Sequence, residues 1–286
     1  MDSFTSPNWQ YLNSRDLDLG AASPVVFPFQ KRSLLASAAK EGVLYLLDAN
    51  ALGGGLSEHS KPLYQSARLG NDEELLGGRG VWGAMATYED PQGHRFLYVP
   101  MWGPRSKNVP QFKYSYDDAP NGSVMAFQVS AEGDKPSLIP AWISRDMHVP
   151  DPPVVANGVV YAIQTGENTV QNPGRPGGDL AGGPGRGPAQ GPLGTGAQAA
   201  APGGGRGSGA NPAAAAAAAL QSAKFRATPV SNLILYAFDA ETGKQLYSSE
   251  KTITSWVHFS EPVVAAGKVF VVSWDAHVYA FGLKSQ

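Results

Sequence analysis

The order in which short segments recur is the feature that most restricts how this chain can fold. Four stretches follow the same course: paired valines or other apolar residues, a turn, a second apolar run, and a third run that ends near "AF" or "LL". They span residues 23–53, 80–133, 151–250 and 260–283. Within each stretch, short alternating runs are bounded by Gly, Pro, Asn or Asp, a pattern that predicts β-strands.

The spacing of these copies predicts the architecture. Once the Gly-rich loop at 53–78 and a long insertion in the third copy are set aside, the copies recur about every 40 to 50 residues. Three or four short strands per period are typical of β-propeller blades. We therefore expect an all-β fold, with one partial propeller domain over residues 1–286 and about four blades of four antiparallel strands. Two stacked β-sandwiches are the rival, but they would not explain why the segments return in one order.

The insertion covers residues 168–228 and has a different composition. It is rich in Gly, Pro and Ala and has almost no side chains that could build a core, so we expect it to be disordered. It should lie within one blade, between the second and third strands, because the cost of closing a loop grows only slowly with its length. Its arginines, Arg175, Arg186 and Arg206, are too sparse to indicate binding to nucleic acid.

Composition excludes several classes of function. The chain has 22 basic and 24 acidic residues, so it has no overall field that would attract nucleic acid or an anionic membrane. It has no cysteine, which excludes disulfides, thiolate metal sites and a cysteine nucleophile. No histidine spacing suggests a metal site. Neither a membrane span nor a signal peptide is expected in the sequence as it stands.

The segment Ala237–Tyr247, "AFDAETGKQLY", resembles a known repeat. It is similar to the docking motif of pyrroloquinoline-quinone (PQQ) repeats, A-x-D-x-x-T-G-x-x-x-W, with Tyr247 in place of tryptophan. Asp239 and Thr242-Gly243 should shape the turn, and the final aromatic should pack flat between neighbouring blades. The resemblance covers the chain outside the insertion. It implies a ring of seven or eight blades in a periplasmic or secreted protein, so we expect this chain to be a carboxyl-terminal part of one.

The same resemblance suggests a quinone site of the kind found in quinoprotein alcohol dehydrogenases. "GGRGVWG" is similar to the strand whose tryptophan lies under PQQ, which would make Trp82 a stacking platform. The spacing of "YDDAPNGSVMAF" would make Asp117 the catalytic base, and "AAKEGVLYLLD" would bring Lys40 to the quinone oxygens. In such a site the carboxylate takes the alcohol proton, while calcium and a cation polarise the quinone carbonyl.

Structural roles compete with these assignments. Trp82 would equally serve as an aromatic between blades, Asp117 as a turn-forming residue, and Lys40 as a hairpin residue with its amine in water. Lys40 also precedes Asp117, the reverse of the order in that family, and the expected calcium-binding asparagine is missing. Asp275 and His277 are two apart in a predicted strand and could pair on one face, but they lack an identifiable nucleophile.

Two functions remain open. The first is an exported scaffold or binding module without bound quinone, whose partners are other proteins or missing blades of the same propeller. The alternative is a PQQ- and calcium-dependent alcohol or sugar dehydrogenase, or a fragment of one. An open half-ring would leave apolar faces and strand edges unpaired, so self-association is also expected.

Overall fold

β-strands, nearly all of them in antiparallel pairs, are the main regular structure of the described chain. The structure is a computed structural model, described for residues 2–54, 59–74, 79–166, 233–257 and 259–282. These residues belong to one unit formed by Met1–Thr169 and Pro229–Gln286. The predicted insertion, 168–228, lies outside them, so its disorder stays a prediction.

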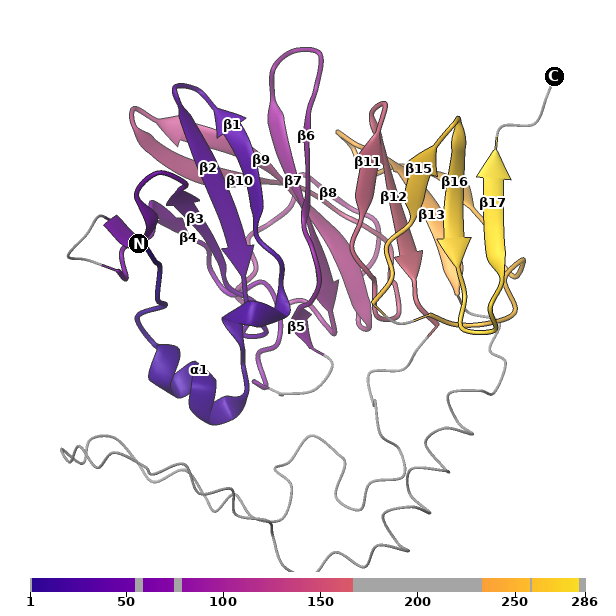
Figure 1. Cartoon of the computed structure of the whole chain (residues 1–286), viewed down its shortest axis with the longest axis horizontal. Coiled ribbons are helices and arrows are strands. Elements are labelled where there is room, and N and C mark those ends of the chain that lie inside the picture. Colours follow the sequence, from indigo (N-terminus) through magenta and orange to yellow (C-terminus); the bar gives the residue numbers. More distant parts are fainter. Residues whose placement is uncertain (1, 55–58, 75–78, 167–232, 258, 283–286) are drawn as a thin grey trace, which may run out of the picture. The chain divides into compact units, whose positions relative to one another are not determined.

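Four sheets follow one another in chain order (Figure 1). The first sheet contains β1 (Val25–Phe29), β2 (Arg32–Ala38), β3 (Leu44–Asp48) and β4 (Tyr64–Gln65). The second sheet contains β5 (Gly80–Val81), β6 (Ala86–Glu89), β7 (Arg95–Trp102), β8 (Tyr114–Ser115), β9 (Gly122–Glu132) and β10 (Lys135–Ile143). The third contains β11 (Val154–Ala156), β12 (Val159–Gln164), β13 (Ile234–Asp239) and β14 (Gln245–Ser248). The fourth contains β15 (Val263–Ala265), β16 (Lys268–Val272) and β17 (Val278–Gly282).

The predicted fold class is confirmed: the chain is all-β and is built from blade-like antiparallel sheets. In the first and third sheets the strands pair in sequence order, and the second sheet contains the same path, β6–β7–β9–β10. In the third sheet β12 pairs with β13, although Gln164 and Ile234 are far apart in sequence. Residues 165–233 therefore separate, in chain order, two strands that pair in the same sheet.

Neighbouring sheets pack through side chains that alternate along their strands. In β7, Leu97, Val99 and Met101 face a core shared with the first sheet. Phe96 and Tyr98 point the other way, into a core shared with the third sheet. Because successive side chains of a strand point to opposite faces, β7 is apolar on both. A strand buried on both sides reads as a continuous apolar run rather than as an alternating one.

The amino-terminal residues cover the outer face of the first sheet, which the sequence did not predict. This segment includes α1 (Trp9–Arg15) and a short 3₁₀ turn, η1 (Leu19–Ala21); a second 3₁₀ turn, η2 (Leu52–Gly54), follows β3. Phe4 packs against Tyr45 in a cluster on the face of β3 that points away from the second sheet. The Tyr45 hydroxyl donates to Glu41 Oε1 at 2.9 Å and hydrogen-bonds Ser6 Oγ at 3.0 Å. The outer face of β3 is therefore covered, whereas Val26 of β1 stays exposed.

The fourth sheet is covered on one face among the described residues. Val269 and Val271 of β16 join a core with the third sheet, and Tyr279 and Phe281 of β17 pack against it. The intervening residues face the other way and stay exposed along β17. The two ends of the row of sheets thus differ: one carries a cover of the chain's own residues and the other an open apolar face.

Candidate functional site

Lys40 lies buried in the loop after β2. Its Nζ atom donates to Asp18 Oδ2 at 2.7 Å and to the Asp16 carbonyl at 3.1 Å, and its side chain is 8% exposed. The expectation that the amine lies in water is wrong, because the amino-terminal segment folds back over this loop. Asp18 therefore balances the charge of Lys40.

Trp82 lies beside Lys40 in a group of aromatic side chains. Lys40 Nζ is 4.6 Å from the centroid of the Trp82 ring, a cation–π contact. The rings of Trp82 and Trp102 stack with centroids 4.9 Å apart and planes 4° apart. Phe259 lies parallel to both, with its centroid 6.0 Å from each. The structure thus brings together Lys40 and Trp82, but the protein's own side chains already cover much of the Trp82 ring.

Gly80, two residues before Trp82, lets two segments of the backbone approach closely. Gly80 has a φ of 88°, and a Cβ atom there would lie 1.9 Å from the Lys40 carbonyl oxygen. That oxygen also accepts a hydrogen bond from Asn71 Nδ2 at 2.7 Å. Part of the Gly-rich pattern "GGRGVWG" therefore has a structural cause, because only glycine leaves room for the Lys40 backbone.

Trp102 is the residue of this group that sequence reasoning missed. Its ring is fully buried, and its Nε1 atom donates to the Pro150 carbonyl at 2.7 Å. One signal was present in the sequence, since the dipeptide Trp82-Gly83 recurs as Trp102-Gly103. Phe259 gives no comparable signal.

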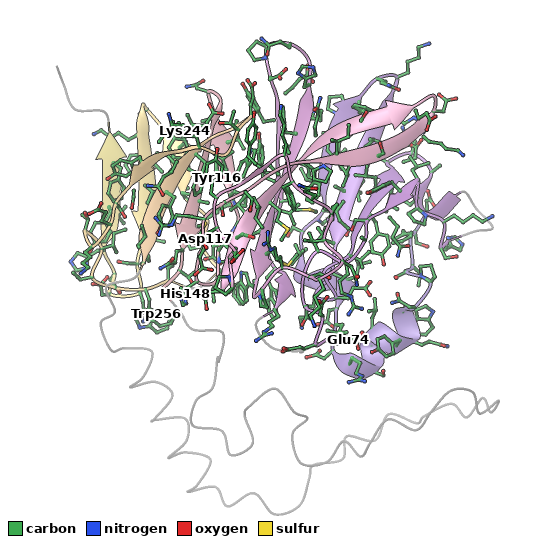
Figure 2. The ribbon with its side chains drawn as sticks, turned by 180° about the vertical axis from the view of Figure 1, so that it is seen from behind. Glu74, Tyr116, Asp117, His148, Lys244 and Trp256 are labelled. Atoms are coloured by element: carbon green, nitrogen blue, oxygen red, sulfur yellow. The ribbon has the colours of Figure 1, made fainter. Side chains whose placement is uncertain are left out.

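Asp117 lies on an exposed loop after β8 (Figure 2). Its carboxylate accepts hydrogen bonds from the backbone N–H groups of Asp118 at 2.7 Å and Asp146 at 3.4 Å. These bonds hold the pKa of Asp117 below its ordinary value. Asp117 lines a small pocket with Tyr116 and Arg145. A carboxylate with a lowered pKa is a weak base, so this geometry matches a turn-forming role better than a catalytic one.

The described residues fit a quinone and calcium poorly. Calcium takes six to eight oxygen ligands, usually several of them carboxylates. Among the residues that the structure describes, no cluster of three or more Asp, Glu or His side chains could hold a metal ion. Lys40, the expected cation, is already paired with Asp18.

Asp275 and His277 lie in a turn rather than on a strand, since β16 ends at Val272 and β17 begins at Val278. His277 Nδ1 is 3.2 Å from Asp275 Oδ2, and the Ser273 hydroxyl also donates to the Asp275 carboxylate. That hydrogen bond helps to lower the pKa of Asp275. The hydroxyl thus bonds the carboxylate and not the imidazole, which is the geometry of a hairpin turn and not of a nucleophile with its base.

The docking motif forms a well-packed contact between the second and third sheets, which we call the closed junction. Asp239 Oδ1 accepts hydrogen bonds from the N–H of Thr242 at 2.8 Å and from its hydroxyl at 2.7 Å, which shapes the predicted turn. Trp142 of β10 packs on this turn, and its Nε1 donates to the Ala240 carbonyl at 2.9 Å. A Cβ at Gly243 would lie 2.4 Å from the Trp142 ring. The aromatic that packs on this turn is therefore Trp142, from the preceding copy of the repeat, and not the motif's own Tyr247.

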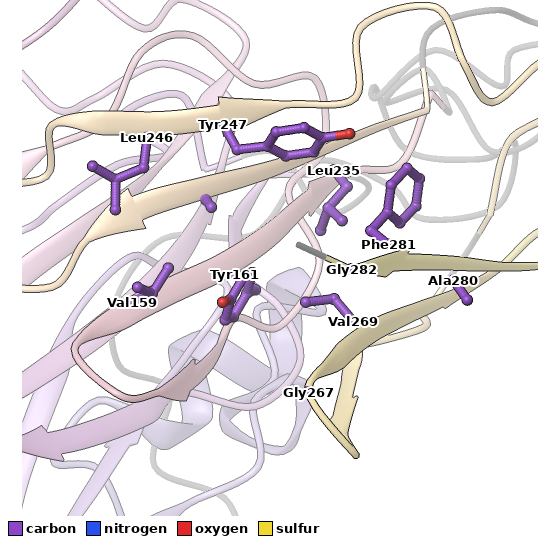
Figure 3. Close-up of a pocket in the computed structure, with 11 residues that line it drawn as sticks. Val159, Tyr161, Leu235, Leu246, Tyr247, Gly267, Val269, Ala280, Phe281 and Gly282 are labelled. Atoms are coloured by element: carbon purple, nitrogen blue, oxygen red, sulfur yellow. The ribbon is translucent and has the colours of Figure 1, made fainter. Parts of the chain in front are cut away.

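Tyr247 reaches the next contact, between the third and fourth sheets, which we call the open junction (Figure 3). Its side chain is 43% exposed, and its ring meets Phe281 at 6.1 Å with the planes 58° apart. The expectation that Tyr247 packs flat between blades is wrong. A groove of about 530 Å³ separates the sheets here, and its lining includes Leu235, Leu246 and Gly282.

The outer face of the fourth sheet is apolar and exposed. Val263, Val272 and Val278 are 56%, 45% and 67% exposed. Val272 and Val278 are opposite each other in the strand pairing, and Phe270 pairs with both Val263 and Ala280, so these five side chains form one patch.

Comparisons with known proteins give little beyond the fold. No protein-family model and no curated protein matches the chain. One similar solved structure is the crystal structure of BamB from Moraxella catarrhalis, with 10% sequence identity and a TM-score of 0.34. The match covers 93% of this chain and 58% of that one. Within the described residues, no helix is long and apolar enough to cross a membrane.

Proposed function

We propose that this protein is a propeller scaffold of the PQQ-repeat kind that binds other proteins and holds no quinone in this chain. One observation carries the proposal: the outer face of the fourth sheet exposes a continuous patch centred on Val272 and Val278. An exposed apolar patch of this kind marks an interaction surface on a folded protein. On the outer face of the first sheet, the amino-terminal segment covers Tyr45 and Leu47 of β3, and Val26 of β1 stays exposed.

The competing hypothesis is a PQQ- and calcium-dependent dehydrogenase. The contact between Lys40 and Trp82 favours it, since the family resemblance puts both residues at the quinone. Three observations oppose it: Asp18 already pairs with Lys40, Trp102 stacks on Trp82, and Asp117 lies on a separate loop. The scaffold proposal agrees with all three.

A crosslinking experiment tests the scaffold. A photoreactive amino acid is placed at Val278 on the patch or, as the matched control, at Ile139, an exposed apolar position on β10. In the native cell, irradiation should give a discrete crosslinked partner from position 278 and not from 139, because only the first lies on the proposed surface. Equal labelling from both positions, or none from 278, would count against a binding surface here.

A cofactor titration tests the competing hypothesis. The full chain is mixed with PQQ and calcium, and the quinone absorbance is followed before and after an alcohol and an artificial electron acceptor are added. The scaffold proposal predicts neither a spectral change nor acceptor reduction. Acceptor reduction that is lost in Asp117→Ala but retained in Asp118→Ala would establish the dehydrogenase instead.

A periplasmic or secreted location is part of the proposal and rests on the resemblance of Ala237–Tyr247 to the PQQ repeat. Fractionation of the source cells, with the protein tagged at its natural locus, tests it. Recovery in the cytoplasmic fraction would contradict export without bearing on the binding surface.

A further inference from the structure

The outer edge of β17 differs from the corresponding edge in the other sheets. In each of the other three sheets, the strand that corresponds to β17 pairs with a further antiparallel strand: β3 with β4, β9 with β10, and β13 with β14. Among the described residues, β17 pairs with β16 alone. An edge strand presents a row of backbone N–H and C=O groups to which another strand can bond.

The sequence of β17 repeats that of a strand whose partner is known. Tyr236-Ala237-Phe238 of β13 recurs as Tyr279-Ala280-Phe281 of β17. In the third sheet this triplet pairs with β14, where Ala237 is opposite Tyr247 and Phe238 is opposite Gln245. In β17 the same triplet lies on the outer edge, so a strand like β14 would find matching side chains there.

The groove of the open junction lies where such a strand would bind. Tyr279 and Phe281 face the third sheet, and Phe281 and Gly282 line the groove opposite Leu246 and Tyr247. Residues directly opposite each other in an antiparallel pair share a face of the sheet. Residues of an added strand opposite Tyr279 and Phe281 would therefore point at Leu246 and Tyr247 and cover the groove.

The described residues near the amino terminus lie on the first sheet and not at this edge. The Thr5 N–H bonds the His59 carbonyl, and the Leu52 N–H donates to the Asp2 carboxylate, so the segment is held on the first sheet. An extended strand of another polypeptide would fill both the edge and the groove.

We propose that β17 binds, in antiparallel register, a β-strand of a partner protein that carries small or apolar residues opposite Tyr279 and Phe281. This binding mode adds a strand to a sheet, with main-chain hydrogen bonds giving affinity and the groove giving selectivity. The inference rests on the proposed scaffold function and names one surface through which it would act.

A synthetic peptide tests the proposal. The probe is a fluorescent peptide of the chain's own residues Asp239–Glu250, which contains β14 and its preceding turn, titrated with the full-length protein. Saturable binding is expected. A peptide with Ser249→Pro should bind at least about tenfold more weakly, because the Ser249 N–H bonds the Leu235 carbonyl in the third sheet and proline has no N–H to donate.

Protein variants locate the site. Tyr247→Ala should weaken binding about two- to tenfold, since it removes an aromatic wall of the groove. Ile139→Ala, which changes an exposed residue of the second sheet, should leave binding unchanged. A peptide with valine in place of Gln245 and Ser248, the residues that would lie opposite Phe281 and Tyr279, should bind more tightly than the natural sequence.

Three results would overturn the proposal: no saturation up to about 1 mM peptide, equal binding of the Ser249→Pro peptide, or slow hydrogen exchange of the β17 edge amides in the unbound protein. The last would mean that the edge is already paired. Crosslinking from Val278 reports on the outer sheet face and not on this edge, so the strand proposal can fail while the scaffold function stands.

Discussion

The closed and open junctions are built from the same repeat and pack differently. At the closed junction the Trp142 ring is fully buried against Gly243, and the Ala240 carbonyl accepts hydrogen bonds from both Trp142 and Tyr98 at 2.9 Å. At the open junction Tyr247 is half-exposed and touches Phe281 at an angle. Both aromatics come from the fourth strand of the preceding blade-like sheet.

The two junctions differ in the surface against which the aromatic side chain packs. Trp142 meets a tight turn that Asp239 and Gly243 shape in the next sheet. At the open junction Tyr247 instead meets Phe281 of β17 and lines a groove. A docking motif is therefore divided between two junctions: its turn receives the aromatic of the preceding copy, and its own aromatic serves the copy that follows.

The largest expected effect comes from removing the buried ring. Trp142→Ala should lower the free energy of unfolding by about 3–5 kcal/mol, the usual cost of deleting a large buried aromatic. The matched change at the open junction, Tyr247→Ala, should cost about 1 kcal/mol or less, because much of that ring is already in water. Denaturant unfolding of both variants measures the difference. Equal losses of unfolding free energy would mean that Tyr247 is packed as tightly as Trp142 and would contradict the difference between the two junctions.

A pair of glycine substitutions separates contact from backbone strain. Gly243 and Gly267 share a φ of 71°, but a Cβ at Gly243 meets the Trp142 ring, whereas one at Gly267 has nothing within 4 Å. Gly267→Ala should therefore cost about 1 kcal/mol, from strain alone. Gly243→Ala should cost about 2–4 kcal/mol, because it also displaces the indole. Thermal unfolding of the two variants checks the order, and a reversed order would refute the tight contact.

Tyr98 links the closed junction to pH. Burial, together with nearby groups that include Asp239, raises the pKa of its phenol above the ordinary value. The folded state then holds this proton more firmly than the unfolded state, so the stability it contributes is complete below about pH 10 and falls as the pH rises beyond. Tyr98→Phe should cost about 1 kcal/mol at neutral pH, through the lost hydrogen bond. Between about pH 10 and 11.5 the wild type should lose stability faster than the variant, by up to about 1.4 kcal/mol per pH unit. If the free energies of unfolding of the wild type and of Tyr98→Phe fell in parallel over this pH range, the phenol would not be buried as described.

Local turn chemistry made much of the fold predictable. The stretch that begins at Ser23 forms β1, β2 and β3 with the predicted turn at Glu41-Gly42, where Gly42 has a φ of 77°. The Asp239–Gly243 turn also formed as predicted, because the hydrogen bonds that the Asp239 carboxylate and carbonyl accept within it come from residues at most four apart. Such patterns act within a few residues and can be read from the sequence.

Long-range contacts were not predictable in the same way. The burial of Lys40 depends on Asp18, 22 positions earlier, in a segment that follows no repeat. Local sequence therefore placed Lys40 at a turn and could not reveal the residues that fold over it. The assignment of Trp82 as a platform had the same limit, since its stacking on Trp102 becomes visible only when two strands pair. Asp275 and His277 were assigned to a strand because their hairpin turn contains neither glycine nor proline.

The smallest expected effect lies on the outer face of the fourth sheet, where no junction forms within the described chain. Val278→Ser should change the free energy of unfolding by no more than about 0.5 kcal/mol, because the side chain is 67% exposed. Val271→Ser, one register pair away on the buried face, should cost several times more, since it puts an unpaired hydroxyl into the core shared with the third sheet. Self-association, measured by sedimentation, should weaken in Val278→Ser and not in the Ile139→Ser control. A large stability loss in Val278→Ser at every protein concentration would mean that this face is covered within a single chain, and the open end of the row of sheets would then have a cover like that of the first sheet.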